Sequence, residues 1–124
     1  MSDVRSYRDL QVWQRAMDVA VETYELTKAY PREELFGLTA QSRRAASSIA
    51  ANIAEGYGRA TMASYLSFLR IAHGSLKELE THLILAGRVG LTASETVDPL
   101  LEKTDELGRM LHGLITRVQG KPAR

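Results

Sequence analysis

The polar residues with the most regular spacing lie on one stretch, between residues 41 and 55. They follow one another at intervals of three or four, which places them on one face of an α-helix: Gln41, Arg44, Ser48, Asn52 and Glu55. Asn52 and Glu55 stand among alanines and isoleucines, where an unpartnered charge costs several kcal/mol. We therefore expect a polar network that fixes the register of neighbouring helices, and contact with a ligand or an anion is the functional alternative. The expected members are Arg44, Asn52, Glu55 and Ser75, with Arg43 and Arg59 as further candidates.

A metal site is the second kind of chemistry to test. Helix bundles hold carboxylate-bridged metal pairs with two Glu-x-x-His elements on facing helices, and this sequence contains no such element. Glu78 and His82 are four residues apart but lack the further ligands of a stable site, so we expect a surface or interface pair. His73 and His112 have no partner evident in the sequence, and we expect packing or hydrogen-bonding roles for them.

The remaining residue types give little support for an enzymatic activity. No serine, histidine and acid are marked as a set by local context, and no glycine pair forms a phosphate-binding loop. The chain has no cysteine, which excludes disulfide frameworks, thiolate metal sites and cysteine catalysis. We expect no enzymatic activity, no catalytic residue, no metal and no cofactor.

The charge balance argues against a dedicated nucleic-acid-binding protein, because 16 basic and 15 acidic residues give a net charge of +1. The distribution is less even than the total. Residues 41–77 hold five basic residues against one acidic, and 109–124 hold four against none, whereas 1–40 and 78–108 are acidic. These zones either pair between neighbouring helices or subunits, or form a binding surface.

Four amphipathic segments must position these residues. Apolar residues at helical spacing predict helices over about 8–28, 35–57, 62–88 and 92–119, followed by a frayed tail at 120–124. Pro31 ends the first segment, and negative charge at Glu33 and Glu34 suits the start of the second.

Glycines and a threonine mark the ends of the middle helices. We expect Gly56 and Gly58 to supply a left-handed C-cap, Thr61 to cap the third helix, and Gly87 with Gly90 to end it. The fourth helix begins either at a Thr92–Glu95 capping box or at Asp98–Pro99; in the first case Pro99 removes an internal hydrogen bond.

The short links favour antiparallel neighbours, so residues 1–124 are predicted to form a single all-α domain, an up-down-up-down four-helix bundle. The N-terminal residues lack an apolar signal core, and no apolar run approaches the ~20 residues that span a bilayer. We expect a soluble, cytoplasmic protein with no membrane partner.

Apolar and small residues exceed what one buried stripe per helix requires. Ala46, Ala50 and Ala54 recur every four residues, and the third segment has apolar residues on two adjoining faces. We therefore expect a homo-oligomer. The alternative is a broad intramolecular core in which small residues fill tight crossings.

Several short motifs resemble those of one known family. They are Leu10-Gln-Val-Trp13, Tyr30-Pro31, Glu34-Leu-Phe-Gly-Leu38, Gln41-Ser-Arg-Arg-Ala45, Ser48-Ile49, Asn52-Ile-Ala-Glu-Gly56, Arg59, Phe68-Leu69 and Ala72-His-Gly-Ser75. From about Tyr7 to about Val118 the chain is similar to the four-helix-bundle proteins encoded in intervening sequences of 23S ribosomal RNA genes. That family includes the accessory variability determinants of diversity-generating retroelements.

The resemblance implies a ring of five subunits without enzymatic activity. It also implies binding of nucleic acid and a reverse transcriptase for the retroelement members, through a strongly basic surface. This chain is nearly neutral, and it has His73 where the family signature often has a basic residue, so positive charge there depends on pH.

Two functions follow as hypotheses. The first is a non-enzymatic, homo-oligomeric adaptor, expected to be a pentamer, that binds RNA or DNA through clustered basic residues. The first contacts would be Arg43, Arg44, Arg59, Arg70 and Lys77, and the second Arg109, Arg117 and Lys121. The alternative is a protein-interaction scaffold, for example for a reverse transcriptase, with no direct nucleic-acid binding.

Overall fold

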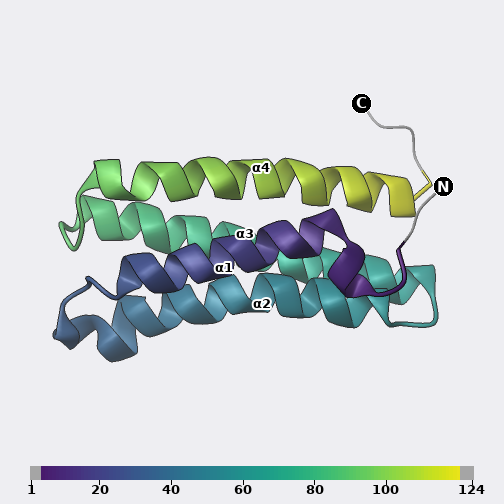
Figure 1. The fold of residues 1–124 in the computed structure, drawn as a ribbon, viewed down its shortest axis with the longest axis horizontal. Coiled ribbons are helices and arrows are strands. Elements are labelled where there is room, and N and C mark those ends of the chain that lie inside the picture. The colour runs from purple at the N-terminus through teal and green to yellow at the C-terminus, as the bar shows by residue number, and fades with distance from the viewer. Residues whose placement is uncertain (1–3, 121–124) are drawn as a thin grey trace.

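Four long helices lie side by side along the longest axis of the molecule (Figure 1). The computed structural model describes residues 4–120. The helices are α1 (Gln11–Thr27), α2 (Ala40–Tyr57), α3 (Met62–Arg88) and α4 (Ser94–Val118). α1 and α3 run in one direction, α2 and α4 in the other, and each helix packs against its two neighbours in the order α1, α2, α3, α4 and back to α1. This confirms the predicted up-down-up-down four-helix bundle.

The boundaries of α3 agree with the prediction, and its caps explain why. The Thr61 hydroxyl accepts a hydrogen bond from the Ser64 amide at 3.1 Å, as expected of an N-cap. At the other end the Leu91 amide donates to the Ala86 carbonyl and the Gly90 amide to the Gly87 carbonyl, which is a Schellman motif. Gly90 has a φ of +82°, whereas Gly87 is still helical. Gly90 therefore supplies the left-handed residue that ends the helix.

The predicted starts of the first two helices are too early. Leu10 is extended, so α1 begins at Gln11, and residues Tyr7–Asp9 form a separate 3-10 turn capped by Ser6. α2 begins at Ala40 because Arg32–Glu34 and Leu35–Thr39 form a 3-10 and a π-helical turn, interrupted at Gly37 by non-helical dihedrals. Glu34 does lie at this start, where its carboxylate accepts a hydrogen bond from the Leu38 amide at 3.1 Å.

Two further predictions about helix ends are wrong. Gly58 has a right-handed φ of −81°, and Gly56 is a buried residue inside α2, so neither forms a left-handed C-cap. α4 begins at Ser94, between the two predicted starts, with Ala93 in the N-cap position and no capping side chain. Pro99 lies inside α4.

Large residues of α3 and α4 and small residues of α2 fill the core. Fully buried leucines of α3 face α2 residues that include Ala45, Ala46 and Ile49; the leucines are Leu69, Leu76, Leu79 and Leu83. Ala50 is also buried, but Ala54 is only partly so. The row of alanines at positions 46, 50 and 54 is thus buried in the crossing of the helices at one end and reaches the surface at the other. The predicted tail at 120–124 lies outside the described residues apart from Gly120.

Candidate interaction surfaces

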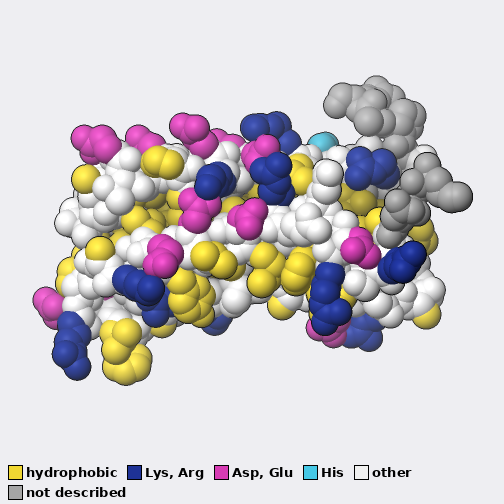
Figure 2. Space-filling view, in the orientation of Figure 1, with side chains coloured by type: hydrophobic (Ala, Val, Ile, Leu, Met, Phe, Trp, Pro, Cys, Tyr) yellow, Lys and Arg dark blue, Asp and Glu magenta, His cyan; other side chains and the backbone are white. Residues whose placement is uncertain are grey.

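An apolar groove runs between α1 and α2 on the outside of the bundle. We call it the α1–α2 groove; its volume is about 640 Å³, and aromatic and aliphatic side chains of α1 form one wall while small residues of α2 form the other. The lining includes Trp13, Met17, Val21, Tyr24, Ala50, Ala51 and Ala54. Met17, Val21 and Tyr24 are 40%, 58% and 45% exposed, and Figure 2 shows hydrophobic side chains gathered along this face. Apolar surface of this extent is typical of a protein interface.

Three further exposed apolar residues lie on one side of α3, where Ser75, Glu78 and His82 separate the first from the other two. Ile71, Leu85 and Val89 are 49%, 43% and 59% exposed, and they lie within about 40° of one another around the helix. We call these three residues the α3 ridge. The apolar residues that the sequence shows beyond one buried stripe are thus at the surface of the single chain.

The polar face of α2 meets α3 in three separate groups. In the first, the Arg44 guanidinium pairs with the Glu78 carboxylate at 2.8 Å and also contacts Gln41, while His82 Nε2 lies 3.3 Å from the same carboxylate. Partial burial alone would raise the pKa of Glu78, but the hydrogen bonds from His82 and Arg44, and their charges, bring it below its ordinary value. Glu78 and His82 are therefore a side-chain pair on the α2–α3 surface.

In the other two groups of α2, the expected members of the polar network have partners different from those predicted. The Asn52 amide donates to the Ser48 carbonyl at 2.8 Å, and the Ser48 and Ser75 hydroxyls are 2.8 Å apart. Glu55 pairs instead with Arg59 at 2.6 Å on the surface. The structure thus joins Asn52 to Ser75 through Ser48 and places Arg44 and Glu55 in pairs of their own.

Four of the eight basic residues considered for nucleic-acid binding already have partners inside the chain. Arg43 donates to the Thr27 hydroxyl at 2.8 Å and lies over the Tyr24 ring at 4.6 Å. Arg59, besides its pair with Glu55, lies 4.8 Å from the centre of the Phe68 ring. Lys77 pairs with Glu80 at 3.1 Å. The ion pairs of Arg44, Arg59 and Lys77 offset part of the positive charge on this side of the molecule, whereas Arg43 keeps its charge and is held by neutral partners.

The candidate basic residues that have no ion pair or hydrogen bond lie on α3 and α4. Within residues 4–120, Arg70 and Arg109 make no ion pair or hydrogen bond. Arg109 lines a second groove, the α3–α4 groove, of about 630 Å³; Arg70 lies one turn before His73 on the same stripe of α3. The lining comprises His73, Lys77, Asp105, Gly108, Arg109, His112, Gly113 and Thr116. Arg117 lies in a neighbouring groove beside α1, and Lys121 is outside the described residues.

The two histidines of this groove were missed as site residues. Burial, and then the charges of Lys77 and His112, lower the pKa of His73 below its usual value, although Glu80 acts in the opposite direction. These effects favour the neutral form of His73. Spacing alone could have suggested this face, because His73 and Lys77 on α3, like Arg109 and His112 on α4, recur at three or four residues.

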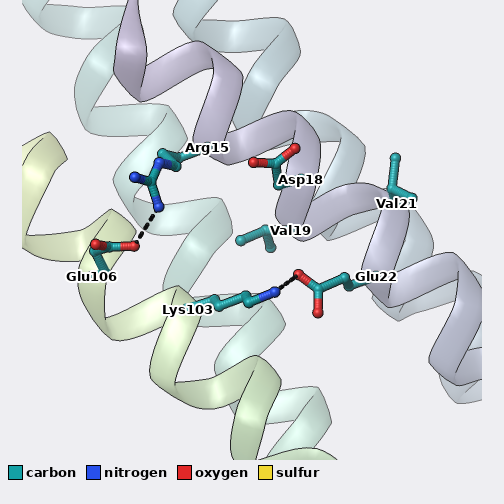
Figure 3. A pocket seen from close by; sticks show the side chains of 7 residues that line it. All are labelled: Arg15, Asp18, Val19, Val21, Glu22, Lys103 and Glu106. Atoms are coloured by element: carbon teal, nitrogen blue, oxygen red, sulfur yellow. Dashed lines mark hydrogen bonds and ion pairs between the residues drawn. The ribbon is translucent and has the colours of Figure 1, made fainter.

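Ion pairs join α1 and α4 on a third side of the bundle. Arg15 of α1 pairs with Glu106 of α4 at 2.9 Å, and Lys103 pairs with Glu22 at 2.5 Å (Figure 3). Asp18 lies between these pairs and has no hydrogen bond or ion pair of its own within the described chain. Basic and acidic zones are thus partly neutralised between neighbouring helices.

Among residues 4–120, no group of three or more His, Asp or Glu side chains is arranged to hold a metal ion. No helix there has the length and apolar character needed to cross a bilayer.

Comparison with known proteins gives a family match and solved structures of similar fold. Residues 8–113 match the family described as 23S rRNA-intervening sequence protein. The fold is similar to that of a protein of unknown function from the S23 ribosomal protein family of Bacteroides thetaiotaomicron. The TM-score is 0.75 at 24% identity, over 84% of this chain and 97% of that one. No curated protein matches the sequence.

Proposed function

Since the chain belongs to the 23S rRNA-intervening sequence protein family, we propose that it is a non-enzymatic scaffold that assembles with copies of itself. The observation that carries this proposal is the α1–α2 groove, about 640 Å³ in volume and lined mainly by apolar side chains. Full burial of a large apolar side chain stabilises by roughly 1–3 kcal/mol. Met17, Val21 and Tyr24 are partly exposed, so a contact with another chain would recover part of this energy. The groove therefore supports assembly rather than a solitary bundle.

Mass in solution tests this proposal. The wild-type protein is expected to give the mass of an oligomer by light scattering at micromolar concentration. Val21→Asp places a charge in the groove at a position that is 58% exposed, so it should leave the fold intact and lower the mass. Met62→Asp, at a residue 63% exposed that does not line this groove, is the matched control and should keep the wild-type mass. A monomeric wild-type protein at these concentrations would refute self-assembly.

Binding of RNA or DNA is the second candidate function, and the unpartnered Arg70 and Arg109 favour it. They flank the α3–α4 groove together with Lys77, on a side of the molecule different from the α1–α2 groove. An oligomer would repeat this modest charge in every subunit and so raise the affinity through multivalency. Arg43, Arg44 and Arg59 fit this role less well because each already has a partner.

A salt series tests this second candidate. Mixed-sequence RNA and DNA should bind with a steep salt dependence, and the double variant Arg70→Gln/Arg109→Gln should lower the slope by roughly two units, since each lost phosphate contact removes about one. Arg44→Gln is the control and should leave the slope unchanged. Equal slopes in all three proteins would show that the α3–α4 groove is not the binding site. If the wild type binds neither RNA nor DNA at low salt, nucleic-acid binding is refuted and the scaffold function is the candidate that is left.

A further inference from the structure

The α3–α4 groove gathers nitrogen-bearing side chains from two helices. They are His73 and Lys77 of α3 and Arg109 and His112 of α4. The volume of about 630 Å³ is in the range of pockets that bind small molecules. Guanidinium, ammonium and imidazolium groups all donate charge-assisted hydrogen bonds to phosphate oxygens. Among the lining residues the acidic side chain is that of Asp105, so the lining as a whole is basic.

The register of the two helices brings the two histidines to the same level. α3 and α4 run in opposite directions (Figure 1), and a Cβ added at Gly108 would lie 3.5 Å from a methyl group of Leu76. His73 lies about one turn from this level toward the start of α3, and His112 lies one turn toward the end of α4. The charge of His112 lowers the pKa of His73, as expected of neighbouring rings. One ligand between the helices can therefore contact both rings.

Two glycines of α4 line this groove, although the fold requires neither of them. Within a helix, glycine costs about 1 kcal/mol relative to alanine. An added Cβ would come no nearer than 3.5 Å to other atoms at Gly108 and 3.6 Å at Gly113, which is ordinary contact. Neither residue has a positive φ. Packing and backbone conformation thus leave both glycines unexplained, whereas space for a ligand between basic side chains explains them.

The charges around His73 make it responsive to a bound anion. Burial and the charges of Lys77 and His112 lower its pKa, and Glu80, which pairs with Lys77 at 3.1 Å, acts in the opposite direction. An anion in the groove favours the protonated ring, so binding takes up protons and strengthens as the pH falls. On α3 and α4, the helices that form the groove, the charged or titratable groups around His73 are Arg70, Lys77, Glu80, Asp105, Arg109 and His112.

We propose that the α3–α4 groove binds the dianionic group of a phosphate monoester. Lys77 and Arg109 supply permanent positive charge. The rings of His73 and His112 donate hydrogen bonds when they are protonated. A monoester carries about 1.5 to 2 negative charges near pH 7, whereas each phosphate inside a nucleic-acid strand carries one, so a cluster of four donors suits the monoester better.

This inference names the chemical group that the groove recognises, and it does not require RNA or DNA to bind along its length. Phosphate monoesters occur on free small molecules and at the 5′ ends of nucleic-acid strands. Arg109 makes no hydrogen bond or ion pair within residues 4–120, so its guanidinium donors are available to either source.

The three histidines of the chain allow a test inside one protein, by NMR of their ring Cε1–H signals. At pH 6.5, millimolar inorganic phosphate added at constant ionic strength should shift the signals of His73 and His112 toward those of the protonated form. His82, which lies beside Glu78 on the α2–α3 surface, is the internal control and should not respond. Phosphate that moves all three signals equally, or none of them, would overturn the inference.

Affinities of variants and a pH series give a second readout. Arg109→Gln should raise the dissociation constant of phosphate about three- to tenfold, because it removes a charge-assisted donor. Arg88→Gln removes an exposed arginine of α3 that does not line the groove, and it should leave the constant unchanged. Sulfate stays dianionic between pH 6 and pH 8 and should bind about fivefold more tightly at pH 6. Equal constants in the two variants, or sulfate binding that does not depend on pH, would contradict the site.

The source of the phosphate is distinguished with a nucleoside 5′-monophosphate and two DNA strands of one sequence, one with a 5′ phosphate and one with a 5′ hydroxyl. Tighter binding of the phosphorylated strand supports a site for strand ends. Displacement of inorganic phosphate by the nucleotide, with equal binding of the two strands, supports a site for a free monoester. If the strands bind equally and phosphate leaves the histidine signals unmoved, the inference fails while nucleic-acid binding stands. If phosphate binds and neither strand does, nucleic-acid binding fails and the inference stands.

Discussion

Single residues set how closely the helices approach. At Gly56 an added Cβ would lie 2.6 Å from the Cβ of Phe68 and 3.3 Å from the Tyr65 carbonyl oxygen. Both atoms lie on the rigid part of α3, so α2 and α3 can pack at this distance only because residue 56 has no side chain. The requirement at Gly56 is therefore steric rather than conformational.

Gly56→Ala should lower the free energy of unfolding by about 1–3 kcal/mol, because the two helices must separate to admit the methyl group. Gly58→Ala is the control: an added Cβ there comes no nearer than 3.7 Å to other atoms, and the backbone is right-handed. Its stability should stay within about 0.5 kcal/mol of the wild type. Urea unfolding followed by circular dichroism measures both, and similar losses in the two variants would contradict the steric explanation.

Glu78 links three side chains, and its lowered pKa gives a pH-dependent prediction. A carboxyl with a lower pKa in the folded state adds stability. This stability is present above the ordinary pKa of 4.5 and is lost as the pH falls through the lowered value. Its side chain is 38% exposed, so solvent screening limits the contribution to about 1 kcal/mol or less.

Glu78→Gln should therefore be less stable than the wild type near pH 7, and the difference should shrink as the pH is lowered below 4. Denaturant unfolding at pH 7 and pH 3 provides the measurement. Asp98→Asn, at an exposed position on α4, serves as the control. A difference between Glu78→Gln and the wild type that stays constant from pH 7 to pH 3 would show that the charge of Glu78 is not the source of the stability.

At the scale of the elements, the capped ends follow local chemistry and the uncapped starts do not. α3 begins at a threonine cap and ends at a left-handed glycine, and both are visible in the sequence. α2 and α4 begin without a capping side chain. Their first residues are therefore set by the turns that precede them and by packing.

Gly90→Ala tests the end of α3. With a φ of +82°, any residue with a Cβ is strained here, so alanine should cost about 1 kcal/mol of unfolding free energy, even though nothing lies within 4 Å of the added atom. Gly90→Asn should cost less, because asparagine tolerates this conformation better. Thermal unfolding ranks the three proteins, and an alanine variant as stable as the wild type would mean that the turn can change its conformation freely.

At the scale of the whole molecule, the bundle buries one apolar face of each helix and leaves two further apolar surfaces in water. The α1–α2 groove and the α3 ridge are on the outside of a fold whose core is already filled by residues such as Leu76 and Ile53. Charges are distributed differently: among the described residues three ion pairs join neighbouring helices, as between Arg15 and Glu106, and the other ion pairs lie within one segment. We therefore expect apolar surface, rather than net charge, to set how the molecule meets others.

Assembly predicts that thermal stability depends on protein concentration. A 100-fold increase in wild-type concentration should raise the Tm by about 5–10 °C, since subunit association stabilises the folded state by mass action. The Tm of Val21→Asp should change little over the same range. Differential scanning calorimetry at both concentrations gives the comparison, and a wild-type Tm that does not move would argue that the bundle acts alone.

The sequence by itself determined the bundle. Helical periodicity, Pro31, Thr61 and Gly90 act within a few residues of themselves, so the number, order and approximate limits of the helices could be predicted without knowing their packing. The same local signals misplaced the starts of α1 and α2, because extended or irregular backbone at Leu10 and Gly37 interrupts patterns that look continuous in the sequence.

Only the tertiary structure decided which side chains are available to a partner. Whether an arginine is free depends on residues far away in the chain: Arg43 contacts Tyr24 and Thr27, and Arg44 contacts Glu78, whereas Arg109 has no such partner among residues 4–120. The α1–α2 groove likewise needs two helices side by side before it exists. Charge and hydropathy are properties of residues, but exposure and pairing belong to the packed arrangement of helices.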